Sequence, residues 1–402
     1  MTQHVDVKDV TADPDGSAVP TQDPQEPQDR ATPSPRLAAA VVAGFAALAV
    51  GVSVLGGDLL NPAASTTDGD YSGETVEMMI PLAEGGGTDT WARFVATELT
   101  HQVPGSPGLA PVNDDGGEGI LGTNHFMSSA RTDGTEVLVS TASTVVPYLL
   151  DMPSVRYDFA DLRPILANGT GAVVYARAAA GVQGVEDLVE RDKPLVFGGI
   201  AATSLDLTTL LAFDLLGADV TSTFGFEGRG PVNLALQRGE VDIDYQTTSS
   251  YGPAVEPLVE DGTAVPLFSL GQVDESGEIV RDPNFPDLPT VVEVYEQLNG
   301  EQPDADALET YRAILALTYT YQKALWVPED TPDEAVELLR STAEDMGADP
   351  DFQESAAEVL GGYPIDASPD LAERIGDAYR VDDAVREDVL ELLETDHDIT
   401  ID

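Results

Sequence analysis

The hydrophobic pattern divides the chain into segments of different character. Residues 1–36 are polar, contain six prolines and show no apolar period, so they are predicted to be a disordered cytoplasmic tail. Residues 37–57 contain no charged side chain, and residues 58–73 have the composition of a short linker. From residue 74 onward, strand-like and helix-like segments alternate, which predicts folded α/β structure.

The run over residues 37–57 is long enough to cross a membrane. Its 21 residues would span roughly 31 Å as a helix, close to the ~30 Å of a hydrocarbon core. Arg30 and Arg36 precede the run and Asp58 follows it, so the positive-inside bias places the tail in the cytoplasm. We therefore expect a single-pass protein of the cell membrane with its body on the extracellular face. A cleaved signal peptide ending near residues 62–64 is the alternative.

The body has the signature of an α/β protein. Apolar residues at helical spacing follow the first predicted strand, and helices are predicted over 203–216 and 231–238. This alternation predicts largely parallel sheets. Short strands are predicted at 75–80, 136–140, 171–176, 195–197, 220–226, 241–245 and 264–270.

Three later segments complete the expected fold. Residues 312–327 form a long apolar run that suits either a crossing strand or a buried helix, and periodicity does not decide between them. Residues 300–310 are acidic and are predicted to be a surface loop. Thr331, Pro332 and Glu334 supply the signals that begin a helix, so the C-terminal part is predicted to be helical.

Composition excludes several function classes. The chain carries 72 acidic and 19 basic residues, a net charge of −53 spread along its length, which fits a surface adapted to concentrated salt. Nucleic acid is excluded as a partner because phosphate binding needs clustered basic residues. With no cysteine and four scattered histidines, thiolate chemistry is ruled out and a histidine metal site is not expected. No metal or cofactor is predicted.

Three glycine- or hydroxyl-rich turns follow predicted strands. They lie at residues 80–89, 140–144 and 197–204, and each leads into a predicted helix. Backbone N–H groups at a helix N-terminus suit an anion, and ligands of open α/β sheets bind at the carboxyl ends of strands. Any one of these turns alone is better explained as an ordinary capped turn, but three together favour a ligand cleft.

Motifs for nucleotide binding or catalysis are weak. Residues 117–122 formally match GxGxxG, but they do not follow a firm first strand, so dinucleotide binding is not expected. No serine lies in GxSxG, and no histidine is positioned as a base. The chain is therefore predicted not to be an enzyme.

The ordered series of motifs resembles the solute receptors of tripartite tricarboxylate transporters, over about residues 74–365. The opening IPLAEGGGTDTWAR at 80–93 looks like the strand, glycine loop and helix that begin that family, and 197–204 is similar to its second-lobe glycine loop. Further segments of the series lie at 113–122, 132–135, 141–144, 157–159, 162–165, 226–228, 239–242, 286–290 and 326–332.

The resemblance implies a two-lobe α/β fold of the type II periplasmic-binding-protein kind, preceded by one N-terminal transmembrane helix. Lobe 1 would comprise residues 74–170 with 312–402, and lobe 2 residues 171–311. The receptor would capture a small organic mono-, di- or tricarboxylate between the lobes and deliver it to integral-membrane permease subunits. The ligand-binding residues implied are Leu82, Ala83, Gly85, Gly86, Gly87, Thr88, Asp89, Thr141, Ala142, Ser143, Thr144, Gly199, Thr203 and Ser204.

Two positions depart from the family pattern. Glu84 stands where the family usually has proline, and Glu227 where it usually has lysine. Acidification of the surface explains both, and a ligand carrying an ammonium group is the alternative. A sensory ligand-binding domain that signals through a partner is a competing function, and a hydrolase or transferase built on the same lobes is a weaker one.

Overall fold

The computed structural model describes residues 71–401 except 86, 190 and 275, and these residues belong to one compact unit. The predicted tail, the apolar run 37–57 and the linker up to residue 70 lie outside the described residues. In the described part of the chain, no helix combines the length and the apolar character needed to cross a membrane.

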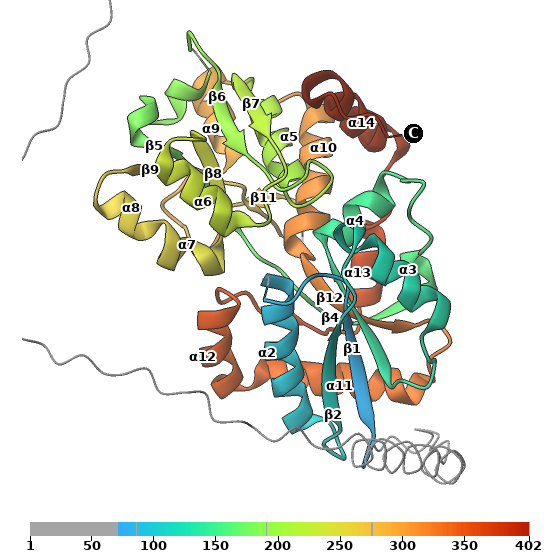
Figure 1. The fold of residues 1–402 in the computed structure, drawn as a ribbon. Helices are drawn as coiled ribbons and strands as arrows, with labels where there is room; N and C mark the ends of the chain where they lie inside the picture. The colour runs from blue at the N-terminus through green and yellow to red at the C-terminus, as the bar shows by residue number, and fades with distance from the viewer. Residues whose placement is uncertain (1–70, 86, 190, 275, 402) are drawn as a thin grey trace, which may run out of the picture. The chain divides into compact units, whose positions relative to one another are not determined.

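The first sheet has six strands in the order β13–β4–β12–β3–β1–β2 (Figure 1). Strands β1, β2 and β3 are parallel, whereas β12 runs antiparallel between β3 and β4. The strands are β1 (Thr75–Ile80), β2 (Gly108–Asn113), β3 (Glu136–Thr141), β4 (Leu162–Asn168), β12 (Lys323–Pro328) and β13 (Ile365–Asp366).

The second sheet has five strands in the order β7–β6–β8–β5–β9. Strand β6 is parallel to β7 and β8, whereas β5 is antiparallel to both of its neighbours. The strands are β5 (Ala172–Arg177), β6 (Leu195–Gly198), β7 (Val220–Thr223), β8 (Ile243–Thr247) and β9 (Ala264–Ser269), with a small separate pair of β10 (Gln272–Val273) and β11 (Ile279–Val280).

Helices cover both sheets (Figure 1). Helix α2 illustrates why, because Trp91, Val95 and Leu99 recur at helical spacing and are all buried. The helices are α2 (Gly87–Gln102), α3 (Ile120–Ser129), α4 (Ala142–Leu149), α5 (Asp206–Leu216), α6 (Arg229–Arg238), α7 (Thr248–Ala254), α8 (Glu256–Glu260), α9 (Val291–Asn299), α10 (Ala305–Leu315), α11 (Asp333–Ala348), α12 (Pro350–Val359), α13 (Leu371–Ala378) and α14 (Asp383–His397).

The α/β class is confirmed, whereas the predicted sheet type is wrong and the predicted surface loop at 300–310 is only partly right. The sheets are mixed and not largely parallel, because β5 and β12 return antiparallel to their neighbours. The run 312–327, which suited either a strand or a helix, contains both. Helix α10 ends in it, a π-helical turn follows at Ala316–Thr320, and β12 then begins. The acidic segment 300–310 is a loop only in part, since α10 starts at Ala305 with Asp304 as its cap.

One buried apolar cluster connects the two sheets. It includes Leu138 and Trp326 from the first sheet and Val174 and Phe197 from the second, and Tyr319 of the π-helical turn belongs to it as well. Because this cluster contains residues of both sheets, the two sheets belong to one folded unit.

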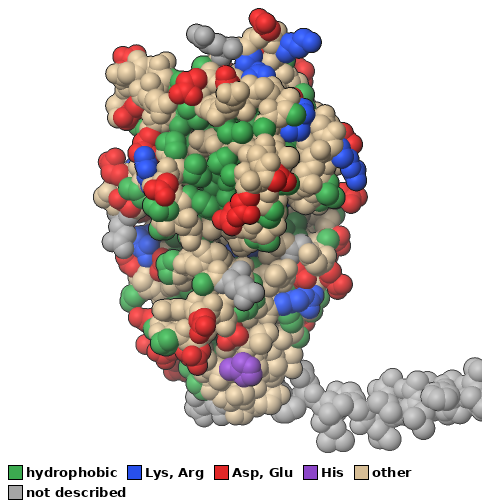
Figure 2. Space-filling model, turned by 90° about the vertical axis from the view of Figure 1, so that its left-hand side faces the viewer, with side chains coloured by type: hydrophobic (Ala, Val, Ile, Leu, Met, Phe, Trp, Pro, Cys, Tyr) green, Lys and Arg blue, Asp and Glu red, His purple; other side chains and the backbone are tan. Residues whose placement is uncertain are grey.

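Acidic side chains are spread over the surface. Figure 2 shows Asp and Glu side chains around an apolar area in the upper part of one face, with basic side chains scattered among them. This agrees with the even distribution of acidic residues along the sequence. Adaptation to concentrated salt stays a prediction.

Candidate functional site

A cavity of about 850 Å³ lies between elements of the two sheets. From the first sheet it is lined by the turn before α2, the start of α4 and the first residues of β12. From the second sheet it is lined by the turn before α5, the start of α6, and the end of β8 with α7. Several helix N-termini therefore meet at one cavity, which is the arrangement predicted from the three turns.

The structure brings most of the predicted residues to this cavity, but not all of them. Those lining it are Leu82, Ala83, Gly85, Gly87, Thr88, Thr141, Ser143 and Ser204. Those that do not line it are Asp89, Ala142, Thr144, Gly199 and Thr203. Gly86 lies outside the described residues.

Asp89 holds the first turn in place and does not face the cavity. Its carboxylate accepts hydrogen bonds from the Gly85 N–H at 2.9 Å, from Arg93 Nε at 2.9 Å and from Asn113 Nδ2 at 3.0 Å. The bond from Arg93 is the main reason that the pKa of Asp89 falls to about 2. Asn113 also donates to the Leu82 carbonyl at 2.9 Å, so one buried carboxylate organises the whole turn.

The second turn is built as a helix cap. The Thr144 hydroxyl accepts from the Thr141 N–H at 3.1 Å and donates to the Thr141 carbonyl at 2.9 Å, and Thr144 is fully buried. Thr144 therefore fixes the start of α4 from behind, while Thr141 and Ser143 line the cavity. This places the partial positive charge of the α4 N-terminus at the cavity wall.

The third turn differs from the prediction because its backbone donors are already occupied. The Asp206 carboxylate accepts from the N–H of Ile200 and, at 3.1 Å, from the N–H of Ala201. Asp206 is completely buried. A carboxylate of the chain itself thus occupies the donors that sequence analysis assigned to a ligand.

Gly199 has a packing role in the same turn. A Cβ on Gly199 would lie 2.5 Å from the ring of Phe224, so the position excludes any side chain. Ser204 lines the cavity, but its hydroxyl donates to the Ala201 carbonyl at 2.7 Å.

Arg229 forms part of the second-sheet wall. Its guanidinium bonds Asp244 at 3.0 Å, lies 3.4 Å from Asp206, and stacks with its Cζ 4.4 Å from the centroid of the Tyr245 ring. Burial raises the pKa of Asp244 to about 6, although Arg229 opposes the shift. The arginine is neutralised by these two carboxylates, so the described residues of this wall offer a ligand no unpaired positive charge.

The sequence pattern did not indicate the site residues at the start of β12. Gln322 and Lys323 line the cavity, and the strand register sets Lys323 opposite Thr141 on β3 and Asn168 on β4. A signal was present, because Lys323 interrupts an apolar run in a chain that has three lysines in all. Glu84 and Glu227, the two departures from the family pattern, also line the cavity and are exposed.

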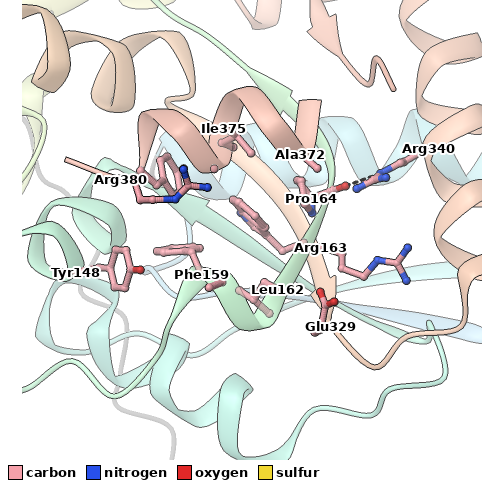
Figure 3. Close-up of a pocket in the computed structure, with 14 residues that line it drawn as sticks. Tyr148, Phe159, Leu162, Arg163, Pro164, Glu329, Arg340, Ala372, Ile375 and Arg380 are labelled. Atoms are coloured by element: carbon pink, nitrogen blue, oxygen red, sulfur yellow. Dashed lines mark hydrogen bonds between the residues drawn. The ribbon is translucent and has the colours of Figure 1, made fainter. Parts of the chain in front are cut away.

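A second cavity of about 460 Å³ lies at the other end of β12 (Figure 3). Tyr148 and Phe159 lie at one side of it, and Arg163 with Glu329 at the other. Arg340 Nε donates to the Pro164 carbonyl at 2.7 Å. None of the predicted turns reaches this cavity, so we take the larger one as the candidate site.

In the part of the chain that the structure describes, no group of three or more acidic or histidine side chains is arranged to hold a metal ion.

The sequence matches no protein-family model, but it is similar to two curated proteins. Protein BugT of Bordetella pertussis is 24% identical over 253 residues, which cover 61% of this chain and 72% of BugT. A UPF0065 protein from the TAR-I ttuE–ttuC' intergenic region of Agrobacterium vitis is 26% identical over 314 residues, which cover 76% of this chain and 80% of that protein.

Solved structures show the same fold. Rpa4515 of R. palustris with adipate has a TM-score of 0.59 at 21% identity, and the match covers 80% of this chain and 98% of Rpa4515. MatC of Rhodopseudomonas palustris with bound malate has a TM-score of 0.55 at 22% identity, and the match covers 79% of this chain and 98% of MatC. The periplasmic binding protein BugD has a TM-score of 0.57 at 20% identity, covering 81% and 99%.

The fold defines an α/β protein of the periplasmic-binding-protein kind. Together with the similarity to BugT, to the UPF0065 protein and to the fold of a TctC solute-binding protein, it confirms the resemblance found in the sequence. BugD and the TctC protein are binding proteins, which agrees with the prediction that this chain is not an enzyme.

The predicted localisation is wrong. Similar structures are described as a periplasmic transporter and a periplasmic binding protein, which does not support a single-pass membrane protein with its body on the extracellular face. The run 37–57, on which that prediction rested, lies outside the described residues.

Proposed function

We propose that the chain is a solute receptor that captures a small organic mono-, di- or tricarboxylate between two lobes and delivers it to membrane permease subunits. The observation that carries this proposal is the cavity of about 850 Å³, where the starts of α2 and α4 meet the second-sheet turns. Helix N-termini favour anions, and a ligand touching elements of both sheets links them.

The ligand class is supported by two related folds, one solved with malate and one with adipate. Binding through the predicted residues that line the cavity, and lobe boundaries at 74–170 with 312–402 and at 171–311, are parts of the same proposal. Thr141 and Ser143 would contact a carboxylate directly, whereas Asp89, Thr144 and Gly199 would act by holding the turns in shape.

Thermal unfolding of the full chain with malate, adipate, a tricarboxylate and neutral sugars tests the proposal. A bound ligand at about 100 times its dissociation constant should stabilise the fold by roughly 2.7 kcal/mol. A shift in melting temperature with at least one carboxylate and none with the sugars is expected. Stabilisation by sugars alone, or turnover of a carboxylate, would overturn the assignment.

A further inference from the structure

Lys323 differs from the other positive charges around the cavity. It lies at the start of β12, half-buried, and it lines the cavity next to Gln322. Its ammonium donates to the Gln322 side-chain oxygen, and no described carboxylate lies within ion-pairing distance of it. Arg191 and Arg340 are also partly buried, but they donate to backbone carbonyls, whereas Lys323 lines the cavity.

The surroundings of Lys323 favour an anion at this place. The register of β12 sets it opposite Thr141, the residue that caps α4, so the ammonium and the α4 N-terminus lie on the same wall. The other charged groups lining the cavity are Glu84, Glu227 and Arg229, and Arg229 is neutralised by Asp206 and Asp244. Within the described part of the cavity, Lys323 is thus the positive charge that a ligand can pair with.

Leaving a buried cation unpaired costs stability, since desolvation penalises the charged form. Burial lowers the pKa of Lys323 to about 8, because the desolvated ammonium gives up its proton more readily than an ammonium in water. A glutamine or methionine at this position would avoid the cost. An anion that pairs with this ammonium would offset the cost.

We infer that Lys323 is the ionic anchor of the ligand and pairs with a carboxylate that also faces Thr141 and Ser143. This inference rests on the proposed function and deepens it. It assigns carboxylate recognition to the first-sheet wall, and it leaves the second-sheet turn, whose donors Asp206 occupies, to shape the rest of the cavity. The anchor belongs to a residue that the family resemblance did not indicate.

The test compares Lys323→Gln with Lys193→Gln, which removes an exposed lysine that does not line the cavity. Binding of malate and adipate to the full chain is measured by calorimetry, with melting temperatures recorded without ligand. Lys323→Gln should weaken binding of whichever acid binds by roughly 10- to 100-fold, while its unliganded melting temperature stays equal or rises. Lys193→Gln should change neither quantity.

A second measurement does not depend on the variant folding. Acetylation of the wild-type chain, mapped by mass spectrometry, should be slowed at Lys323 by the bound acid and left unchanged at Lys193. If wild type binds an acid but Lys323→Gln binds it equally well, or if Lys323 is not protected, the inference is wrong and the proposed function stands. If wild type binds neither these acids nor any other carboxylate, the proposed function itself fails and the anchor fails with it.

Discussion

The hydroxyl of Tyr245 donates a hydrogen bond to Asp206 Oδ1 at 2.7 Å, and neither side chain is exposed to solvent. The other oxygen of the same carboxylate accepts from two backbone N–H groups of the turn at 199–204. One side chain therefore ties this turn to β8, the strand that carries Tyr245. The turn is a fixed wall, and its backbone donors are satisfied before any ligand binds.

Replacing Asp206 by alanine should destabilise the fold strongly. The change removes the acceptor for two N–H groups and for Tyr245, and it takes one carboxylate away from buried Arg229. Losing one partner of a buried ion pair typically costs about 3–5 kcal/mol. Urea unfolding measures the loss, with Asp192→Ala at an exposed position as the control. A loss below about 1 kcal/mol would show that the turn does not depend on Asp206.

Carboxylate binding should weaken above about pH 8. The pKa of Lys323 is lowered by burial from 10.5 to about 8, so its ammonium loses its proton above that pH, and affinity should fall by roughly tenfold per pH unit. The pKa of Asp244, raised to about 6, lies below this window. Calorimetry with adipate between pH 7 and 9.5 measures the effect, and Lys323→Gln should bind weakly with no such slope.

Stability should change with pH in the opposite sense. Below about pH 8 Lys323 is charged in both the folded and the unfolded chain, so the folded state carries the full desolvation cost. Between about pH 8 and 10.5 the folded chain binds fewer protons than the unfolded chain, and this lysine's contribution to stability therefore rises with pH. Urea unfolding of wild type against Lys323→Gln isolates the contribution. The free energy of unfolding of wild type minus that of Lys323→Gln should rise across this range, and a value that falls or stays flat would contradict the assignment.

Gly122→Ala should destabilise the protein by about 1–3 kcal/mol or more, because the core has no room for the added methyl group. A Cβ on Gly122 would lie 2.2 Å from the Asp114 carbonyl oxygen and 3.1 Å from Pro81. Gly122, the last glycine of the GxGxxG match, thus allows α3 to pack closely against Asp114 and Pro81. Gly108→Ala is the control, since its nearest contact would be an ordinary 3.6 Å. Equal melting temperatures for both variants would refute this explanation.

Ligand binding should reduce the radius of gyration of the full chain, measured by small-angle scattering with and without the acid that binds. Closure is expected because a ligand reaches both sheets only when their turns approach. Ser204→Ala should weaken binding roughly threefold to tenfold, since Ser204 lines the cavity. Thr203→Ala is the matched control, because Thr203 does not line it. An unchanged radius at saturating ligand would mean that the cavity is already closed.

Local signals in the sequence were enough to predict the first strand and helix, the three turns and the α/β class. β1 has the bounds predicted for it, and α2 follows directly with its apolar stripe buried. These features depend on neighbouring residues, whose spacing is visible in the sequence. Asp89 and Thr144 were placed in the right turns, although their side chains hold those turns from behind.

The remaining features depend on contacts between distant residues. Asp206 accepts the backbone N–H groups of its turn because Tyr245 and Arg229, distant in the sequence, hold its carboxylate in place. Lys323 reaches the cavity because β12 inserts between β3 and β4, and no local pattern encodes that pairing. Where α10 gives way to β12 was likewise decided by the sheet, since the apolar run suits both structures.

The position of β12 also sets the order in which the chain can fold. β3 and β4 are joined only through β12, whose residues are synthesised more than 150 positions after those of β4. Until β12 arrives, both strands present open edges, and such edges pair readily with other chains. Pairings so distant in sequence also form slowly. The first sheet therefore stays incomplete until residues 323–328 have been made, and its open edges are exposed to unwanted pairing until then.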